Sequence, residues 1–286
     1  MGHVTSGTPV KRIAAITTVR NDTMFLERWA RYYGDQLGAK NIYIFLDGHD
    51  QILPQSIQGV NALYLPHLPL KRGLSDRRRA KVMSDLARSL FSVFDAVIVT
   101  DVDEFIVVDP RLELSLAEFL SQIESRTSVS ALGLDVGQHL ELESPINSNE
   151  PFLDQRKYAH LSSRYTKPSI AFKPITWGSG MHRIKGRNFH IDPNLFLFHF
   201  GMVDYQLATN KTSDKDRIST GWKGHLTRRE KLFKIITESK PLDGDDYFDE
   251  ARHYQTWHRP IYALNKPGMI PSDPVVRIPR RFRGIV

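Results

Sequence analysis

The chain has 286 residues, with 39 lysines and arginines against 32 aspartates and glutamates, 41% hydrophobic residues and no cysteine. This length and composition are typical of a folded globular protein, and they exclude disordered and collagen-like chains. Without cysteine the chain has no disulfide framework, zinc finger, iron–sulfur cluster or thiol nucleophile, so oxygen and imidazole groups must hold any metal.

The formal net charge of +7 and the sequence pI near 9.5 suggest an anionic partner. Basic residues cluster at 77–81, 228–229 and 280–283. We expect most of them to lie on solvated faces and some to hold phosphate or an anionic lipid surface; no nucleic-acid-binding motif accompanies them, so we expect no nucleic-acid partner. No apolar run reaches the roughly 18 residues of a membrane span, and residues 1–12 lack the apolar core of a secretory signal, so a cytoplasmic location is expected.

The first part of the sequence alternates between apolar strands and amphipathic helices. Residues 12–19 are a short apolar run typical of a strand buried on both faces. A helix is expected over about residues 25–37, because apolar side chains recur three and four positions apart and Gly38 follows them. Residues 41–46 are apolar again, and the three segments together predict a βαβ unit with parallel strands.

The same alternation then repeats. Residues 60–65 predict a third strand, and Ser75 is expected to cap a helix that runs to about Phe94. Residues 96–100 predict a fourth strand. We therefore expect residues 10–136 to form an open, mostly parallel α/β sheet with helices on both faces.

The alternation fades in residues 137–286, and a polar loop occupies residues 145–150. Strands are expected at residues 169–172 and 194–200, and a helix at 227–237. The tail from residue 265 is rich in proline and arginine. We expect an elaborated C-terminal half that belongs to one continuous domain with the first.

The strongest local signal is Asp101-Val102-Asp103, directly after the predicted fourth strand. Side chains two positions apart on an extended segment point the same way, so both carboxylates can face one spot. Ligands bind at this edge of an open parallel sheet. Two carboxylates there favour a cation between them, and Mg²⁺ or Mn²⁺ suits oxygen and imidazole ligands. The alternative is an acidic turn that caps a helix.

Together with other segments, this motif resembles a known enzyme family. The strand leading into Asp-Val-Asp-Glu-Phe, the pair Asn21-Asp22 followed by Phe-Leu-Glu-Arg-Trp at 25–29, and Leu37-Gly38 resemble the GT-A fold glycosyltransferases, which use nucleotide sugars. More narrowly, they resemble a bacterial group related to family 2 glycosyltransferases, in which Glu is usual where this chain has Asp22. The resemblance covers residues 12–110 and extends loosely to about residue 200.

The resemblance implies a Rossmann-like GT-A sheet and metal-dependent transfer of a sugar from a UDP- or GDP-sugar to a saccharide or lipid-linked acceptor. Asp103 would be the main metal ligand, Asp101 would contact the metal or the ribose, and Asp47 would lie near the base. The implied donor site also includes the strand-end and motif residues Thr18, Arg20, Asn21 and Val102. A later histidine would complete the metal site, and we favour His182 over His199, which lies among leucine and phenylalanine.

Basic residues could offset the charge of the diphosphate. Arg77, Arg78, Arg79 and Lys81 lie at the predicted start of a helix, where backbone amides also favour anions. Lys185 lies near His182. A solvated surface is the alternative for at least two of the helix residues.

An inverting transferase also needs a carboxylate base beside the acceptor hydroxyl. Asp135 and Glu141 follow the acidic motif at a suitable distance in the sequence, although a plain loop position is the alternative for each. A retaining enzyme needs no such base, so the stereochemistry stays open.

Two other classes of function stay open. A phosphatase of the haloacid-dehalogenase type would use Asp101 as its nucleophile, although Glu104-Phe105 does not match the residues expected after that motif. A non-catalytic domain that binds an anion or a nucleotide is the second. The family implies a bacterial polysaccharide or lipopolysaccharide acceptor, and the basic tail at 280–283 suggests peripheral contact with an anionic membrane.

Overall fold

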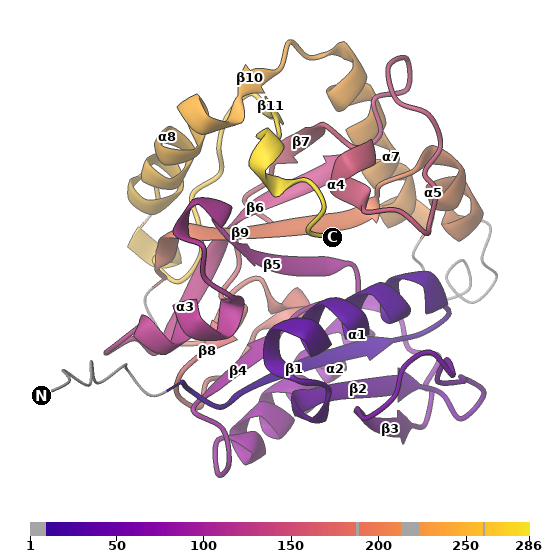
Figure 1. Ribbon diagram of the computed structural model, residues 1–286, viewed down its shortest axis with the longest axis vertical. Helices are drawn as coiled ribbons and strands as arrows, with labels where there is room; N and C mark the ends of the chain where they lie inside the picture. Colours follow the sequence, from indigo (N-terminus) through magenta and orange to yellow (C-terminus); the bar gives the residue numbers. More distant parts are fainter. Residues whose placement is uncertain (1–9, 187–188, 213–222, 260) are drawn as a thin grey trace, which may run out of the picture.

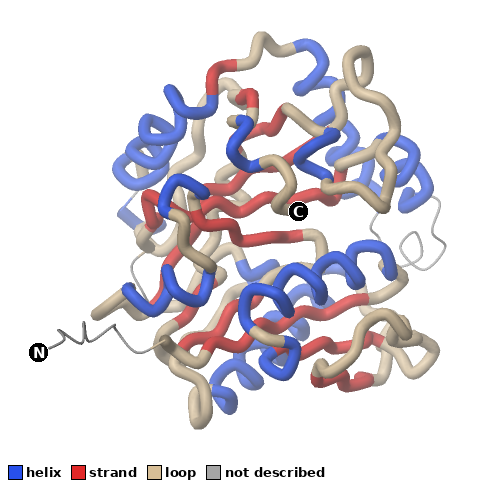
Figure 2. Tube along the Cα trace, in the orientation of Figure 1, coloured by secondary structure: helices blue, strands red, loops and turns tan. Residues whose placement is uncertain are grey.

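The computed structural model describes residues 10–186, 189–212, 223–259 and 261–286. Within these ranges one mixed sheet of eleven strands runs through the molecule, with helices packed against it (Figure 1). The coloured tube in Figure 2 shows the strands as a central layer between helices and loops.

The N-terminal half of the sheet is parallel. Its strands are β1 (Ile13–Val19), β2 (Ile42–Asp47), β3 (Asn61–Leu65) and β4 (Ala96–Val99), in the spatial order β3-β2-β1-β4. Helix α1 (Thr23–Leu37) connects β1 to β2, and helix α2 (Arg72–Leu90) connects β3 to β4. These connections are the crossovers that parallel strands of one sheet require, as the alternating sequence predicts.

The two helices cover opposite faces of this half. Ile13 and Ala15 of β1 pack in one cluster with the buried face of α1, whereas Ile16 packs in a second cluster with Ala80 and Met83 of α2. This alternation follows from the two-residue period of a strand. It confirms the predicted fold class, an open α/β sheet with helices on both faces.

The second half of the sheet is mixed. It comprises β5 (Glu104–Val108), β6 (Ser128–Gly137), β7 (Tyr158–Leu161), β8 (Ile170–Ala171), β9 (Ile191–Met202), β10 (Leu242–Asp243) and β11 (Val275–Arg277). The short strand β8 lies antiparallel between β4 and β6 and so joins the two halves, while β9 pairs with both β5 and β6. The helices of this half are α3 (Leu116–Gln122), α4 (Phe152–Gln155), α5 (Tyr205–Thr212), α7 (Lys223–Glu238) and α8 (Gly244–Trp257).

Aromatic side chains of α1 hold the segment that follows β4. The indole of Trp29 donates to Thr100 Oγ1 at 2.9 Å, and Tyr32 donates its hydroxyl proton to the carbonyl of Ile106 at 2.7 Å. The hydroxyl of Tyr33 accepts the Ile106 amide at 2.9 Å. Each of these rings is buried, so α1 fixes the backbone on both sides of the acidic motif.

One detail differs from the sequence-based expectations, and a second concerns the basic tail. The predicted start of the second helix at Ser75 is wrong: α2 begins at Arg72, because the amides of Leu74 and Ser75 both donate to the Lys71 carbonyl and close an earlier turn. Within the basic tail, Arg281 packs onto the protein and binds both Asp109 oxygens at 2.8 and 3.0 Å, whereas Arg280 and Arg283 are exposed. No helix in the described ranges is both long and apolar enough to cross a membrane. The boundary between the halves at residue 137 stays a prediction.

Candidate active site

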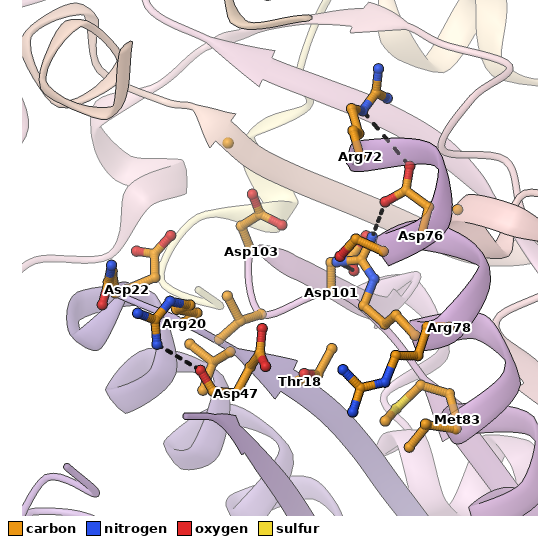
Figure 3. A pocket seen from close by; sticks show the side chains of 18 of the residues that line it. Thr18, Arg20, Asp22, Asp47, Arg72, Asp76, Arg78, Met83, Asp101 and Asp103 are labelled. Atoms are coloured by element: carbon orange, nitrogen blue, oxygen red, sulfur yellow. Dashed lines mark hydrogen bonds and ion pairs between the residues drawn. The ribbon is translucent and has the colours of Figure 1, made fainter. Parts of the chain in front are cut away.

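A cavity of about 560 Å³ opens where β1, β2 and β4 end. The cavity therefore lies at the carboxyl ends of the parallel strands, where ligands bind in open sheets of this kind. Figure 3 shows side chains from several elements around it, with Asp101 and Asp103 between Arg20 and Asp47 on the left and Asp76 and Arg78 of α2 on the right. Its lining includes Thr18, Arg20, Asn21, Asp22, Asp47, Arg72, Asp76, Arg78, Arg79, Asp101, Val102, Asp103, Arg164, Tyr165, His182, His199, Gly201 and Lys211.

Asp103 lies beside a histidine of strand β9. His199 Nε2 is 3.4 Å from Asp103 Oδ2, and its other ring nitrogen, Nδ1, is 2.7 Å from Asp135 Oδ1. Asp135 and His199 are register partners on the parallel strands β6 and β9, which explains their contact. Burial alone would lower the pKa of His199, but the two carboxylates outweigh it and raise the pKa to about 9. Two acids thus surround one imidazole at the cavity wall.

Several neighbours fix the orientation of His199. The ring of Tyr165 stacks on the imidazole, with centroids 3.8 Å apart and planes 16° apart. Gly133 permits this approach, because a Cβ there would lie 2.4 Å from the backbone of Tyr165 and Thr166. The Asp135 carboxylate holds Nδ1, so Nε2 is the nitrogen presented toward Asp103.

These residues fit a divalent cation in the chemistry of their donors. Asp103 offers a carboxylate oxygen and His199 an imidazole nitrogen, and a carboxylate behind a ligating imidazole is the usual arrangement at metal centres. In the described residues no three acidic or histidine side chains are grouped closely enough to hold a metal alone. Two protein ligands suit Mg²⁺ or Mn²⁺, which take further ligands from water and substrate phosphates.

Gly201 leaves the space beside this pair open. A Cβ at that position would lie 2.8 Å from both Asp103 Oδ2 and His199 Nε2. We expect Gly201→Ala to push the two side chains apart and to lower the free energy of unfolding by about 1–3 kcal/mol. Thermal unfolding would measure the loss. Gly73→Ala is the matched control, because a Cβ there meets nothing within 4 Å; equal stability changes in the two variants would contradict this packing.

The first aspartate of the motif has different partners. Asp101 Oδ2 is 3.3 Å from Lys167 Nζ, and Asp101 Oδ1 is 3.3 Å from Arg79 Nη1. Lys167 also lies 2.7 Å from Glu104 Oε1, and Glu104 accepts the Asp101 amide at 3.0 Å through its other oxygen. Burial would raise the pKa of Asp101, but the two cations outweigh it and lower that pKa. Asp101 is thus held as a carboxylate between cations.

The opposite end of the cavity carries the ends of β1 and β2. Arg20 donates to the carbonyl of Asp47 at 2.8 Å and to Asp50 Oδ1 at 3.0 Å, which ties the two strand ends together. The Asp47 carboxylate lies 3.1 Å from His67 Nδ1. Asn21 has a φ of +53° and pairs with Gln51 through its amide and its side chain. Thr18 completes this wall.

Only part of the predicted basic set reaches the cavity. Arg78 and Arg79 line it and Arg72 joins them, whereas Arg77 and Lys81 are exposed on α2 and are not among its described lining residues. Lys81 instead pairs with Asp85, one helical turn away on α2. Lys185 is exposed and also lies outside the lining.

The remaining predicted residues lie apart from Asp103 or behind it. His182 lies at the cavity wall with Nδ1 2.8 Å from the carbonyl of Arg164. Glu141 is exposed in the turn after β6. Asp135 is 1% exposed and borders a second, smaller cavity of about 180 Å³. Sequence reasoning missed Lys167, Tyr165 and Gly201, which carry no motif of their own.

No known protein family and no curated protein matches the sequence. Among solved structures, a mannosyltransferase from Pyrobaculum calidifontis in complex with GDP-Man and Mn²⁺ is similar at a TM-score of 0.40 and 12% identity, over 79% of this chain and 71% of that one. A mannose-1-phosphate geranyltransferase from Thermus thermophilus has a TM-score of 0.30 and 11% identity, over 82% and 70% of the two chains. A CMP:2-keto-3-deoxy-manno-octonic acid synthetase complexed with CTP has a TM-score of 0.27 and 11% identity, over 77% and 87%.

Proposed function

We propose that this protein is a divalent-cation-dependent glycosyltransferase that takes a sugar from a nucleoside diphosphate sugar. The observation that carries the proposal is the pairing of Asp103 with His199, backed by Asp135, in the same cavity as the strand-end residues Thr18 and Asp47. We assign the cation to Asp103 and His199 rather than to His182, whose Nδ1 is directed to a backbone carbonyl.

The chemistry follows from the charges around the cavity. Cleavage of a sugar–phosphate bond leaves negative charge on the diphosphate, and a bound Mg²⁺ or Mn²⁺ stabilises such charge as it develops. Arg72, Arg78 and Arg79 of α2 and Lys211 of α5 line the cavity and would offset the charge that remains. Asp135 orients His199 through the 2.7 Å contact, which we propose as its role instead of a general base. Glu141 stays a prediction as a base.

Calorimetric titration tests the donor class. UDP, GDP and their sugar conjugates would be titrated into the protein with and without Mn²⁺. Binding that requires the cation supports the proposal. If none of these ligands binds under either condition, the transferase proposal fails, and hydrolysis of small phosphomonoesters, which would use Asp101, becomes the next assay.

Arg78 is expected to contribute strongly to donor binding. It lines the cavity beside Thr18 and Met83 (Figure 3), and no carboxylate in the described part of the chain pairs with it. A hydrogen bond to a charged partner contributes about 1.5–3 kcal/mol, so we expect Arg78→Gln to weaken nucleotide binding about 10- to 100-fold. Arg77→Gln, one position away on the exposed side of α2, is the matched control. Equal titration curves for the two variants would place the diphosphate elsewhere.

The acceptor is proposed as a saccharide or a lipid-linked saccharide. The second cavity, which reaches Asp135 and includes Ser162, Ser163 and Arg164, offers polar groups suited to hydroxyls. Arg164 lines both cavities, so donor and acceptor would meet beside it.

A further inference from the structure

The end of α8 and the segment that follows it up to β11 expose large apolar side chains. Trp257 is 71% exposed, Ile261 89%, Tyr262 90% and Met269 74%. Single exposed hydrophobic residues are ordinary, but four large ones within 13 residues of one another are a concentration of exposed apolar surface, which commonly marks an interaction site. We call these four residues with Leu264 the apolar loop.

The backbone of the apolar loop is held firmly against the protein. The Gly268 amide donates to the carbonyl of Gln255 at 2.7 Å, and Ser163 donates its hydroxyl proton to the Gly268 carbonyl at 2.7 Å. Ala263 is 2% exposed and Asn265 donates to the Ile184 carbonyl at 2.9 Å. The loop therefore presents its apolar side chains outward from an ordered frame.

The segment that carries the apolar loop contains basic side chains and no acidic ones, and the nearest acidic residues along the chain are Glu250 and Asp273. Residues 253–270 contain no aspartate or glutamate but include His253, His258, Arg259 and Lys266. The Asn265 contact places the segment at 183–185 beside the loop, and that segment adds the exposed residues Arg183 and Lys185. Arg259 is partly used within the loop, because its Nη1 donates to the Leu264 carbonyl at 2.7 Å.

From these observations we infer that the apolar loop docks onto the surface of an anionic lipid bilayer. Tryptophan and tyrosine favour the boundary between headgroups and acyl chains, and neighbouring lysines and arginines attract anionic headgroups. A second copy of the chain would bring like charges together at this patch, whereas an anionic surface complements them. The inference does not depend on the nucleotide site.

This surface replaces the basic tail as the membrane-facing element. Arg281 is bound to Asp109 and Asp245, and Phe282 is 0% exposed, so these two tail residues have their partners within the protein, while Arg280 and Arg283 are exposed. The apolar loop also supplies Met269 to the second cavity, so a bilayer held by the loop would lie close to that cavity.

Sedimentation of the full chain with vesicles tests the inference. Vesicles of phosphatidylglycerol and phosphatidylcholine would be compared with phosphatidylcholine alone, at low salt. We expect wild-type protein to sediment with the anionic vesicles, and Ile261→Ser combined with Tyr262→Ser to weaken binding about tenfold or more. The matched control is Ile52→Ser combined with Tyr64→Ser, which removes the same residue types, 83% and 42% exposed, from a segment around β3. Lys266→Glu is expected to weaken binding about fivefold.

Tryptophan fluorescence provides a second readout, which needs only the wild-type protein and one single variant. Brominated lipid should quench the emission, and Trp257→Phe should remove most of that quenching while circular dichroism stays unchanged. Failure of the wild type to bind, or equal binding by the loop and control variants, overturns the inference. A loop variant that changes only the oligomeric state, measured by light scattering, would show that a second copy covers the patch and would also overturn it.

Discussion

Replacing Asp103 with asparagine is expected to abolish cation-dependent nucleotide binding and to lower kcat/KM by about a thousandfold. The substitution keeps the size of the side chain and removes the charge that faces His199 at 3.4 Å. A neutral amide is a weaker ligand for Mg²⁺ or Mn²⁺ than a carboxylate, and the remaining imidazole alone would not retain a hard cation. Calorimetry with and without Mn²⁺, followed by transfer assays with the donor so identified, would measure both effects.

The control for this prediction is Asp95, which lies at the opposite end of β4 from Asp103. Asp95 directly precedes β4 and forms an exposed pair with Arg12 at 3.5 Å, so Asp95→Asn should leave binding unchanged and alter stability by less than about 1 kcal/mol. If Asp103→Asn binds the nucleotide with undiminished dependence on Mn²⁺, the cation is held by other residues. Asp101 and His182 would then be the next positions to change.

Much of the fold could be predicted because its first half follows simple periods. The apolar runs of β1, β2 and β4 and the helical spacing in α1 are each sufficient to identify an element, and parallel strands with crossover helices then follow. The second half could not be predicted as well, because β8 has two residues and β10 has two, too few for any period. The parallel pairing of β6 with β9 joins segments about 60 residues apart, and no local signal specifies it.

The same contrast explains what could be predicted of the site. Asp101 and Asp103 follow a recognisable strand, so their place at the cavity was predictable. His199 lies in an apolar strand and has the sequence surroundings of a core histidine; only the register with Asp135 reveals its polar neighbours. Lys167 is 1% exposed, which is rare for lysine, and its role depends on carboxylates more than 60 positions away in the chain.

The buried ammonium of Lys167 gives the second large prediction. Its Nζ lies 2.7 Å from Glu104 Oε1 and 3.3 Å from Asp101 Oδ2, so Lys167→Met would leave the fully buried Glu104 carboxylate without its cation. Breaking a buried pair from one side costs about 3–5 kcal/mol. We expect urea unfolding to show this loss and the melting temperature to fall by about 10 °C. A loss below 1 kcal/mol would show that Arg79 alone compensates the carboxylates.

A double variant separates the loss of charge from the loss of packing. Glutamine at position 104 keeps an oxygen that can accept the Asp101 amide, which Glu104 now accepts at 3.0 Å, and removes the charge. Lys167→Met combined with Glu104→Gln should therefore recover about 2 kcal/mol or more relative to Lys167→Met alone. The single variant should also depend on pH. Burial already raises the pKa of Glu104 in the native protein, where the Lys167 ammonium opposes the rise. Without that ammonium the pKa should rise further, so folding takes up a proton. Its free energy of unfolding should then fall as the pH rises from about 5 to 8, and that of the double variant should not. Parallel pH slopes in the two proteins would show that packing around the Lys167 stem, and not the buried charge of Glu104, sets the loss.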